Sequence, residues 1–194
     1  MKGWILYKDS AAGLRPEAYE MHRFIEAAKE RNIEIRVVKP EQFDLIVTRD
    51  DRKSILLDGE VFPLPDFLIP RMGAGTTYFA LAVIRHLERL GVHVFNSSQS
   101  IETVKDKLFS QQILAERNVP FPKTMLAKYP VDVNLVEQHF GFPLIVKTLS
   151  GSQGSGVFLS ETPSNFRDLM ELIHTTSPNA NIILQEFIED SRGK

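Results

Sequence analysis

The residues best placed to do chemistry lie in a glycine- and serine-rich segment that follows a lysine. Its glycines are spaced as G-x-x-G-x-G, with short polar side chains between them: Lys147, Gly151, Ser152, Gln153, Gly154, Ser155 and Gly156. Glycines let the backbone expose consecutive N–H groups, which form a concave site for phosphate oxygens. Serine hydroxyls can add donors, and the lysine adds a point charge. The segment predicts a phosphate-binding loop, although a plain hairpin turn beside a solvated lysine accounts equally well for these residues.

The spacing does not match either of two common nucleotide-binding fingerprints. A Walker A loop requires Lys and Ser or Thr after its last glycine, where this chain has Val157 and Phe158. A dinucleotide-binding fingerprint requires a helix after the glycines, whereas the apolar residues at 157–160 predict a strand. The glycines are therefore expected at the tip of a β-hairpin.

Two charged residues at the ends of predicted strands are further candidates. Arg71 follows the apolar run at 66–70, and open α/β sheets bind ligands at such strand ends. Its guanidinium can hold a carboxylate through two hydrogen bonds. Glu186 ends another apolar run, where its carboxylate can accept a hydrogen bond from an exocyclic amine. Both residues also fit a less specific interpretation as solvated side chains that close their strands.

The composition excludes several classes of protein. The chain has 194 residues, 43% hydrophobic and 25% charged, which is the balance of a globular protein. A formal charge of −2 argues against direct nucleic-acid binding, and the lack of cysteine excludes disulfides and thiolate zinc sites. The apolar run at 4–7 is too short for a signal or membrane segment, so a cytoplasmic protein is expected. The histidines lack metal-ligand spacing, and His86 is predicted to pack in the core.

The first half of the chain predicts alternating strands and helices. Apolar runs predict strands at residues 3–8, 33–38, 55–57, 66–70 and 92–95, with an Asp58-Gly59 hairpin turn leading to Val61. One helix begins at Pro16 with the core-facing residues Met21, Phe24, Ile25 and Ala28. A second has the core-facing residues Phe79, Ala82, Val83, Leu87 and Leu90. Helices between strands predict a small open parallel sheet over residues 1–97.

The second half predicts a mixed lobe. Residues 97–118 are helical in two pieces, and the prolines at 120 and 122 then force an extended break. Asp132 and Thr162 are predicted to cap helices. Strands are predicted at 123–127, 143–148, 157–160 and 182–188.

The order of these motifs resembles the ATP-grasp ligases, and within them the RimK-like α-L-glutamate ligases. The matching segments are K-D-K-L at 105–108, V-P-F-P at 119–122, F-P-L-I-V-K at 142–147, the glycine-rich hairpin, Q-E-F-I at 185–188 and, upstream, I-P-R-M-G at 69–73. The resemblance implies an α/β fold. A small open parallel-sheet pre-ATP-grasp domain, residues 1–97, would precede the first α+β lobe of an ATP-grasp domain, residues 98–194.

The resemblance also implies roles for individual residues. Lys105 and Lys147 match two lysines that contact ATP phosphates, and the hairpin at 150–156 matches the loop that closes over them. Arg71 lies where a substrate carboxylate is expected. The hinge between the two lobes is matched by Gln185-Glu186-Phe187-Ile188, of which Glu186, Phe187 and Ile188 are expected to bind ATP at its adenine. No catalytic or metal-binding position is matched, because the family's Mg²⁺ ligands belong to a second lobe that is expected to be missing here.

The implied reaction joins glutamate, or another amino acid, to a carboxylate acceptor through an acylphosphate made from ATP. The acceptor would be the C-terminus of a small-subunit ribosomal protein, a carrier protein or a deazaflavin cofactor. Alternatives are a glutathione-synthetase-like or D-alanine–D-alanine ligase, or a non-catalytic nucleotide-binding regulatory module. The chain by itself is expected to be inactive without Mg²⁺ ligands. The strand at 182–188 is predicted to be an open edge that makes the chain a homo-oligomer.

Overall fold

The chain forms two compact units, each of which is described by itself. A computed structural model describes residues 1–8, 16–49, 54–73, 76–149 and 156–189. The first unit is Met1–Glu102 and the second is Thr103–Lys194. The division lies within the helix α3 (Ser98–Lys105), a few residues after the boundary predicted at residue 97.

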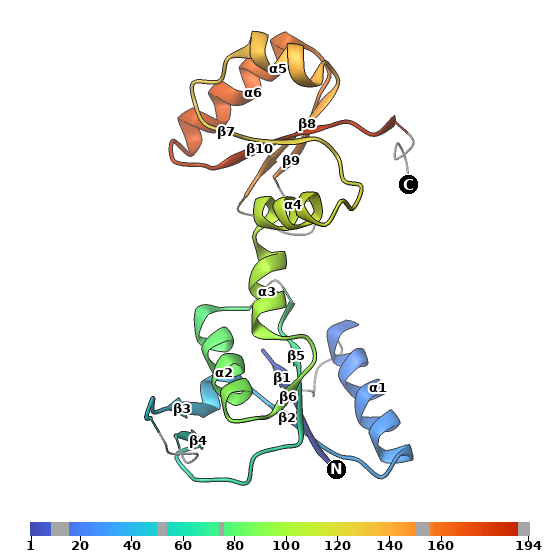
Figure 1. Cartoon of the computed structure of the whole chain (residues 1–194), viewed down its shortest axis with the longest axis vertical. Helices are drawn as coiled ribbons and strands as arrows, with labels where there is room; N and C mark the ends of the chain where they lie inside the picture. Colours follow the sequence, from blue (N-terminus) through green and yellow to red (C-terminus); the bar gives the residue numbers. More distant parts are fainter. Residues whose placement is uncertain (9–15, 50–53, 74–75, 150–155, 190–194) are drawn as a thin grey trace. The chain divides into compact units, whose positions relative to one another are not determined.

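The first unit is built on a parallel sheet. Four strands pair in the order β2-β1-β5-β6, and Figure 1 shows α1 and α2 on opposite sides of this sheet. The predicted open parallel sheet is therefore confirmed. The elements are β1 (Lys2–Tyr7), α1 (Pro16–Glu30), β2 (Glu34–Val38), the 3-10 helix η1 (Pro40–Gln42), β3 (Phe43–Leu45), β4 (Ile55–Leu57), β5 (Phe67–Arg71), α2 (Tyr78–Arg89) and β6 (His93–Val94).

The central strand β1 is apolar throughout because both of its faces are covered. Trp4 and Leu6 belong to one buried cluster that also contains residues of α2, while Ile5 and Tyr7 pack with Met21 of α1. Successive side chains of a strand alternate between faces, so each cluster receives every second residue.

The predicted core faces of the two helices are only partly correct. In α1, Met21 is buried but Phe24 is 38% exposed. In α2, Phe79 is 43% exposed, whereas Ala80 and Ile84 lie in the core. Both predicted faces include residues at the edge of the buried side of the helix. The helical period alone does not show how far around the helix its contact with the sheet extends.

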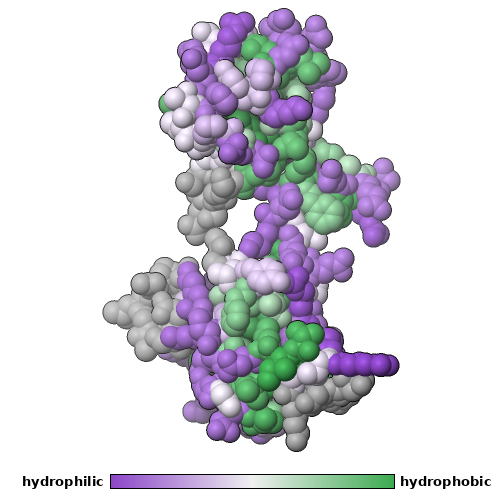
Figure 2. Space-filling model, turned by 90° about the vertical axis from the view of Figure 1, so that its left-hand side faces the viewer, coloured by the Kyte–Doolittle hydropathy of each residue, from purple (hydrophilic) through white to green (hydrophobic). Residues whose placement is uncertain are grey.

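The Asp58-Gly59 turn is confirmed, but its predicted strand partner is wrong. Both turn residues have positive φ, 53° and 80°, as a type I′ turn requires. β4 pairs antiparallel with β3, and Val61 lies outside any strand. Ile46, Val47 and Val61 are half or more exposed, and Figure 2 shows hydrophobic surface on the side that carries β3 and β4. The sequence does not predict β3 because Asp44 interrupts its apolar residues, whereas β4 is a continuous apolar run of the same length.

His86 packs in the core, as predicted. It is 6% exposed, and its Nε2 lies 2.8 Å from the hydroxyl of Ser54, which is also buried. Burial, and to a lesser degree the charge of Arg89, lower the pKa of His86 below its ordinary 6.5. The imidazole is therefore held in its neutral form in the folded unit.

This burial predicts a pH-dependent stability of the first unit. Above pH 6.5 His86 is neutral in both states, whereas below it the unfolded chain binds a proton that the folded unit resists. Stability should thus fall as pH decreases through 6.5, by at most about 1.4 kcal/mol per pH unit. Urea unfolding followed by fluorescence of the buried Trp4 measures this. His86→Gln should remove this part of the slope, and the exposed control His93→Gln should retain it; equal slopes in both would contradict the prediction.

The second unit is built on an antiparallel sheet with the order β7-β10-β8-β9. Figure 1 shows α5 and α6 on one side of this sheet and α4 on the other. Val146, Phe166 and Leu184 are completely buried in the cluster that α5 and α6 cover. The elements are α4 (Lys107–Glu116), β7 (Thr124–Ala127), α5 (Val133–Phe140), β8 (Leu144–Thr148), β9 (Val157–Ser160), α6 (Pro163–Thr176) and β10 (Ile182–Glu186).

The prediction that the last strand forms an open edge is wrong. β10 lies between β7 and β8 and is hydrogen-bonded to both. Ile182, Ile183 and Leu184 are each no more than 2% exposed. β10 therefore makes its backbone hydrogen bonds and buries its apolar side chains within the unit. It gives no reason to expect self-association through this strand.

The helix α5 offers a test of its predicted cap. The Asp132 Oδ1 accepts hydrogen bonds from the N–H groups of Asn134 and Leu135, at 2.9 and 3.3 Å. Asp132→Ala should therefore lower the free energy of unfolding by about 1 kcal/mol, measured by urea unfolding. Asp132→Asn keeps the acceptor and should retain most of the stability. A similar loss in both variants would show that the carboxylate acts otherwise than as a cap.

Candidate functional site

The predicted β-hairpin is confirmed in the described part of the chain. β8 and β9 pair from Leu144–Ser160 to Lys147–Val157, and the N–H of Thr148 donates to the carbonyl of Gly156 at 2.9 Å. Gly156 has a φ of 77°, which favours glycine. The other predicted loop residues lie outside the described residues: Gly151, Ser152, Gln153, Gly154 and Ser155.

Lys147 lies near the end of β8, on the face of the sheet away from α5 and α6. Its neighbour Val146 packs into the helix-covered core, so the alternation of the strand turns Lys147 to the other face. The Nζ donates to Oε1 of Gln185 at 2.5 Å. Burial and then the positive charge of Lys107 lower the pKa of the Lys147 ammonium. This face therefore carries a partly desolvated cation.

The second lysine near the hairpin is Lys107, which the sequence interpretation did not assign. Its Nζ donates to the carbonyl of Thr148 at 2.8 Å, so α4 brings it to the end of β8. Lys105 is exposed at the last position of α3, and its contact with phosphate stays a prediction. Neither Lys107 nor Lys147 has a carboxylate partner among the described residues. Two neighbouring cations without such a partner form a site suited to an anion.

A buried polar network supports Lys147. Gln185 is 7% exposed, and its Nε2 donates to the hydroxyl of Thr124 at 2.9 Å. That hydroxyl donates in turn to the carbonyl of Pro122 at 2.7 Å. Gln185 faces Thr124 across the β10–β7 ladder. The Q-E-F-I motif contains Gln185, but nothing in its local sequence indicates this partner, because Thr124 is distant along the chain.

Glu186 ends β10 and is tied to the segment before β7. Its Oε1 accepts from the N–H of Lys123 at 2.8 Å, and its own N–H donates to the Lys123 carbonyl at 3.0 Å. One carboxylate oxygen thus orders the strand end. Phe187 is half-buried and Ile188 is 43% exposed directly after it. The role of these residues in holding adenine stays a prediction.

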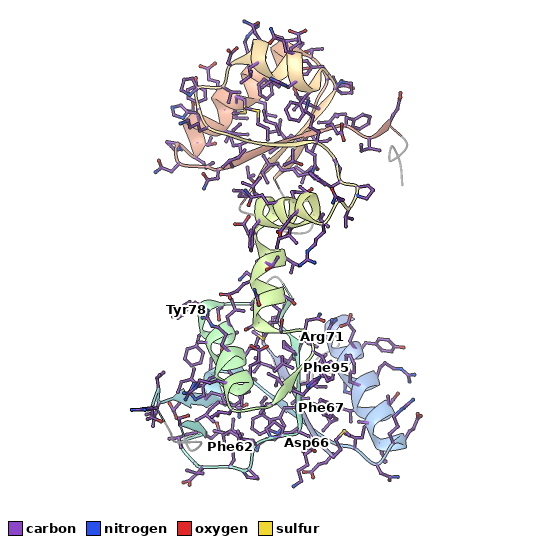
Figure 3. All side chains as sticks on the ribbon, viewed as in Figure 1. Phe62, Asp66, Phe67, Arg71, Tyr78 and Phe95 are labelled. Atoms are coloured by element: carbon purple, nitrogen blue, oxygen red, sulfur yellow. The ribbon has the colours of Figure 1, made fainter. Side chains whose placement is uncertain are left out.

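Arg71 lies at the carboxyl end of β5, as predicted. It is opposite Tyr7 in the parallel ladder, and Figure 3 shows it at the end of the strand beside α1. Its Nη2 forms an ion pair with Glu20 of α1, and both side chains are about half exposed. The guanidinium therefore holds a carboxylate of its own chain, and its contact with a substrate carboxylate stays a prediction.

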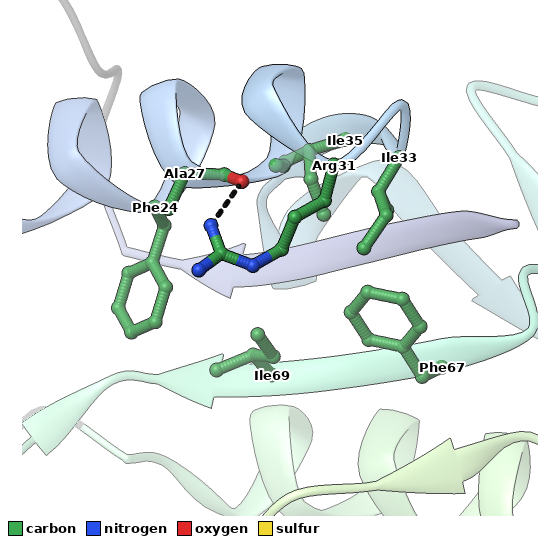
Figure 4. A pocket seen from close by; sticks show the side chains of 8 residues that line it. Phe24, Ala27, Arg31, Ile33, Ile35, Phe67 and Ile69 are labelled. Atoms are coloured by element: carbon green, nitrogen blue, oxygen red, sulfur yellow. Dashed lines mark hydrogen bonds between the residues drawn. The ribbon is translucent and has the colours of Figure 1, made fainter.

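An apolar groove of about 180 Å³ lies between α1 and the sheet of the first unit. Figure 4 shows Phe24 and Arg31 on the helix side and Phe67 and Ile69 on β5. The Arg31 Nη1 donates to the carbonyl of Ala27 at 2.9 Å. None of the predicted site residues lines this groove, so it is separate from the chemistry that the motifs indicate.

The described residues offer no group of three or more His, Cys, Asp or Glu side chains that could hold a metal ion. The Mg²⁺ implied by the resemblance stays a prediction. Among these same residues, no helix has the length and apolar character needed to cross a bilayer.

Comparison with solved structures defines the class of fold. The chain resembles the RimK-domain ATP-grasp protein of Sphaerobacter thermophilus with a TM-score of 0.66 at 19% identity, covering 95% of this chain and 63% of that one. It resembles the ATP-grasp ligase PsnB, solved with a minimal precursor, Mg and ADP, with a TM-score of 0.68 at 18% identity, covering 96% and 63%. The fold is thus that of the ATP-grasp proteins.

Comparison with families and relatives is more specific. Residues 13–101 match the RimK PreATP-grasp domain, and residues 104–194 match the RimK-like ATP-grasp domain. The chain belongs to the RimK-like ATP-grasp family. It is 37% identical over 179 residues to the probable alpha-L-glutamate ligase 1 of Shewanella amazonensis. That match covers 92% of this chain and 58% of the relative, so the chain spans little more than half the relative's length.

Proposed function

We propose that the second unit binds the phosphates of ATP at the end of the β8–β9 hairpin. The observation that carries the proposal is the pair of lysines there, Lys147 and Lys107, which have no carboxylate partner in the described ranges. A bound polyphosphate would supply the negative charge that these cations lack. The predicted loop at 150–156 follows β8 directly, where its N–H groups would add donors for the same oxygens.

The proposed adenine position is the end of β10 and the residues after it. The Oε1 of Glu186 is used by the Lys123 N–H, which leaves Oε2 to accept from an exocyclic amine. The carbonyls and N–H groups beyond the strand end would read the edge of the ring. Phe187 and Ile188 would then provide apolar contact area.

The proposed reaction of the whole protein is the joining of glutamate to a carboxylate acceptor. An acceptor carboxylate oxygen attacks the γ-phosphorus of ATP, which releases ADP and forms an acylphosphate. The amine of glutamate then attacks the acyl carbon, and phosphate leaves as the amide forms. The role proposed for Lys147 and Lys107 is to stabilise charge on the phosphoryl oxygens. The relatives' glutamate-ligase names support this choice of amino acid.

The experiment that tests nucleotide binding is calorimetric titration of the chain with ATP, ADP and adenosine. ATP and ADP are expected to bind more tightly than adenosine, because only they present phosphates to the lysines. Equal affinities for all three would overturn the proposed phosphate site.

The ligase reaction is tested in a chimera that joins this chain to the remaining part of the Shewanella amazonensis relative. ADP release should require both glutamate and a carboxylate acceptor, with the intact relative as the positive control. Release with D-alanine in place of glutamate would instead support a D-alanine-type ligase. ADP release by the relative but not by the chimera would contradict the proposed activity.

A further inference from the structure

We propose that Gln185 is the positioning residue for Lys147: its side-chain amide, held in one orientation by Thr124, aims the ammonium at the phosphate site while leaving its charge free. The inference rests on the proposed function, since it concerns how the phosphate-binding lysine is held. Gln185 lies within the Q-E-F-I motif, but neither the motif nor the predicted site gives its side chain a role.

The strand register brings Gln185, Thr124 and Lys147 to one face of the sheet. Gln185 lies opposite Thr124 on β7 and opposite Ile145 on β8, and Lys147 is two residues further along β8. Residues two apart on a strand share a face, and long side chains reach their diagonal neighbours. The register therefore places side chains from three adjacent strands together on the face away from α5 and α6.

The directions of the hydrogen bonds fix the orientation of the Gln185 amide. A hydroxyl has one hydrogen, and Thr124 donates it to the carbonyl of Pro122 at 2.7 Å. The Thr124 oxygen can then only accept from the Gln185 Nε2, at 2.9 Å. With its NH₂ group fixed there, the amide must present Oε1 to the Lys147 Nζ, at 2.5 Å. The reversed amide would point its NH₂ donor at the Lys147 ammonium and its oxygen at the Thr124 oxygen, whose hydrogen is already donated to Pro122.

The acceptor that Gln185 offers to Lys147 is a neutral amide oxygen. A glutamate at this position would reach the same ammonium but would neutralise it within the chain. The neutral amide oxygen orders the side chain and leaves the positive charge for a ligand. Burial and then the positive charge of Lys107 lower the pKa of the Lys147 ammonium, and an anion bound at the two lysines would relieve the repulsion between them.

The test uses an isosteric charge change and a matched control on the full chain. Gln185→Glu is expected to weaken ATP binding about tenfold or more, a loss of at least ~1.4 kcal/mol, and to leave adenosine binding unchanged. Gln138→Glu makes the same change at an exposed position of α5 and should leave both affinities unchanged. An equal loss for ATP and adenosine in Gln185→Glu would show a merely structural role and overturn the proposal.

A second pair of variants tests the orientation without changing any charge. Thr124→Val removes the hydroxyl that fixes the amide, and Thr124→Ser restores it. ATP affinity should fall about threefold to tenfold in the valine variant and recover in the serine variant, as expected when one neutral hydrogen bond is lost. Failure of serine to rescue binding would contradict the proposed orientation.

A readout without nucleotide separates this proposal from the proposed function. Acetylation of Lys147 at a series of pH values, followed by peptide mass spectrometry, reports the titration of its amine. It should move to higher pH in Gln185→Glu, because a carboxylate favours the ammonium, and to lower pH in Thr124→Val. Absence of ATP binding by the unaltered chain would contradict the proposed function but not the role of Gln185 in holding Lys147. Identical titration curves of Lys147 in all variants would overturn the proposed positioning role of Gln185.

Discussion

Replacement of Lys147 by alanine should weaken ATP binding by a factor of about 10 to 100. The change removes a charge-assisted contact, which is worth roughly 1.5–3 kcal/mol. Lys147 is partly buried and its side chain is already ordered by the hydrogen bond to Gln185. Phosphate binding should therefore cost little further side-chain entropy. Calorimetric titration with ATP measures the loss.

Two controls distinguish a contact between Lys147 and phosphate from a role of Lys147 in supporting the sheet. Adenosine should bind equally to the altered and unaltered chains, because it has no phosphate for Lys147 to contact. Lys128→Ala removes an exposed lysine from the same unit and should leave ATP binding intact. A parallel loss of adenosine binding would mean that Lys147 supports the sheet instead of the phosphates.

Replacement of Phe166 by alanine should destabilise the second unit by about 3–5 kcal/mol, which is a large part of the stability of a small domain. Phe166 is completely buried, and its ring lies 6.0 Å from that of Phe142 in an edge-to-face arrangement. The cavity left by the ring would border both α6 and the sheet, because Leu144 and Val146 belong to the same cluster.

Hydrogen exchange of the β10 amides measures this loss, because these amides lie in the middle of the affected sheet. The matched control is Phe158→Ala on β9, whose ring is 41% exposed and which should cost much less. Equal losses of protection at the two positions would contradict the view that α6 and the sheet share one close-packed core.

The sequence alone determined the local elements and most of their order. The apolar runs are signals within single segments, and they correspond to strands that the structure describes, including the two strands of the β8–β9 hairpin. The same segments carried the family resemblance, which the domain matches confirm. Local hydrogen bonding and periodicity decide these features, so they can be read from neighbouring residues.

Only the tertiary structure determines which lysine, Lys105 or Lys107, lies at the hairpin. Lys105 and Lys107 stand on either side of Asp106, which follows α3 and caps α4 by accepting from the N–H of Leu108 at 2.9 Å. The backbone leaves the helical region at this cap, so the helical period does not carry across it. Only the position of α4 against the sheet shows that Lys107 reaches Thr148.

Long-range pairing also decided the remaining features. The sequence does not show that β10 lies between β7 and β8, so the apolar run by itself predicts an open edge, which the strand order contradicts. The same pairing brings Thr124 to Gln185, and the packing of α1 brings Glu20 to Arg71. Each partner is many residues away along the chain. Strand order and helix packing bring such partners together because they bury entire faces of sheets and helices. The pattern of neighbouring residues does not show which faces will meet.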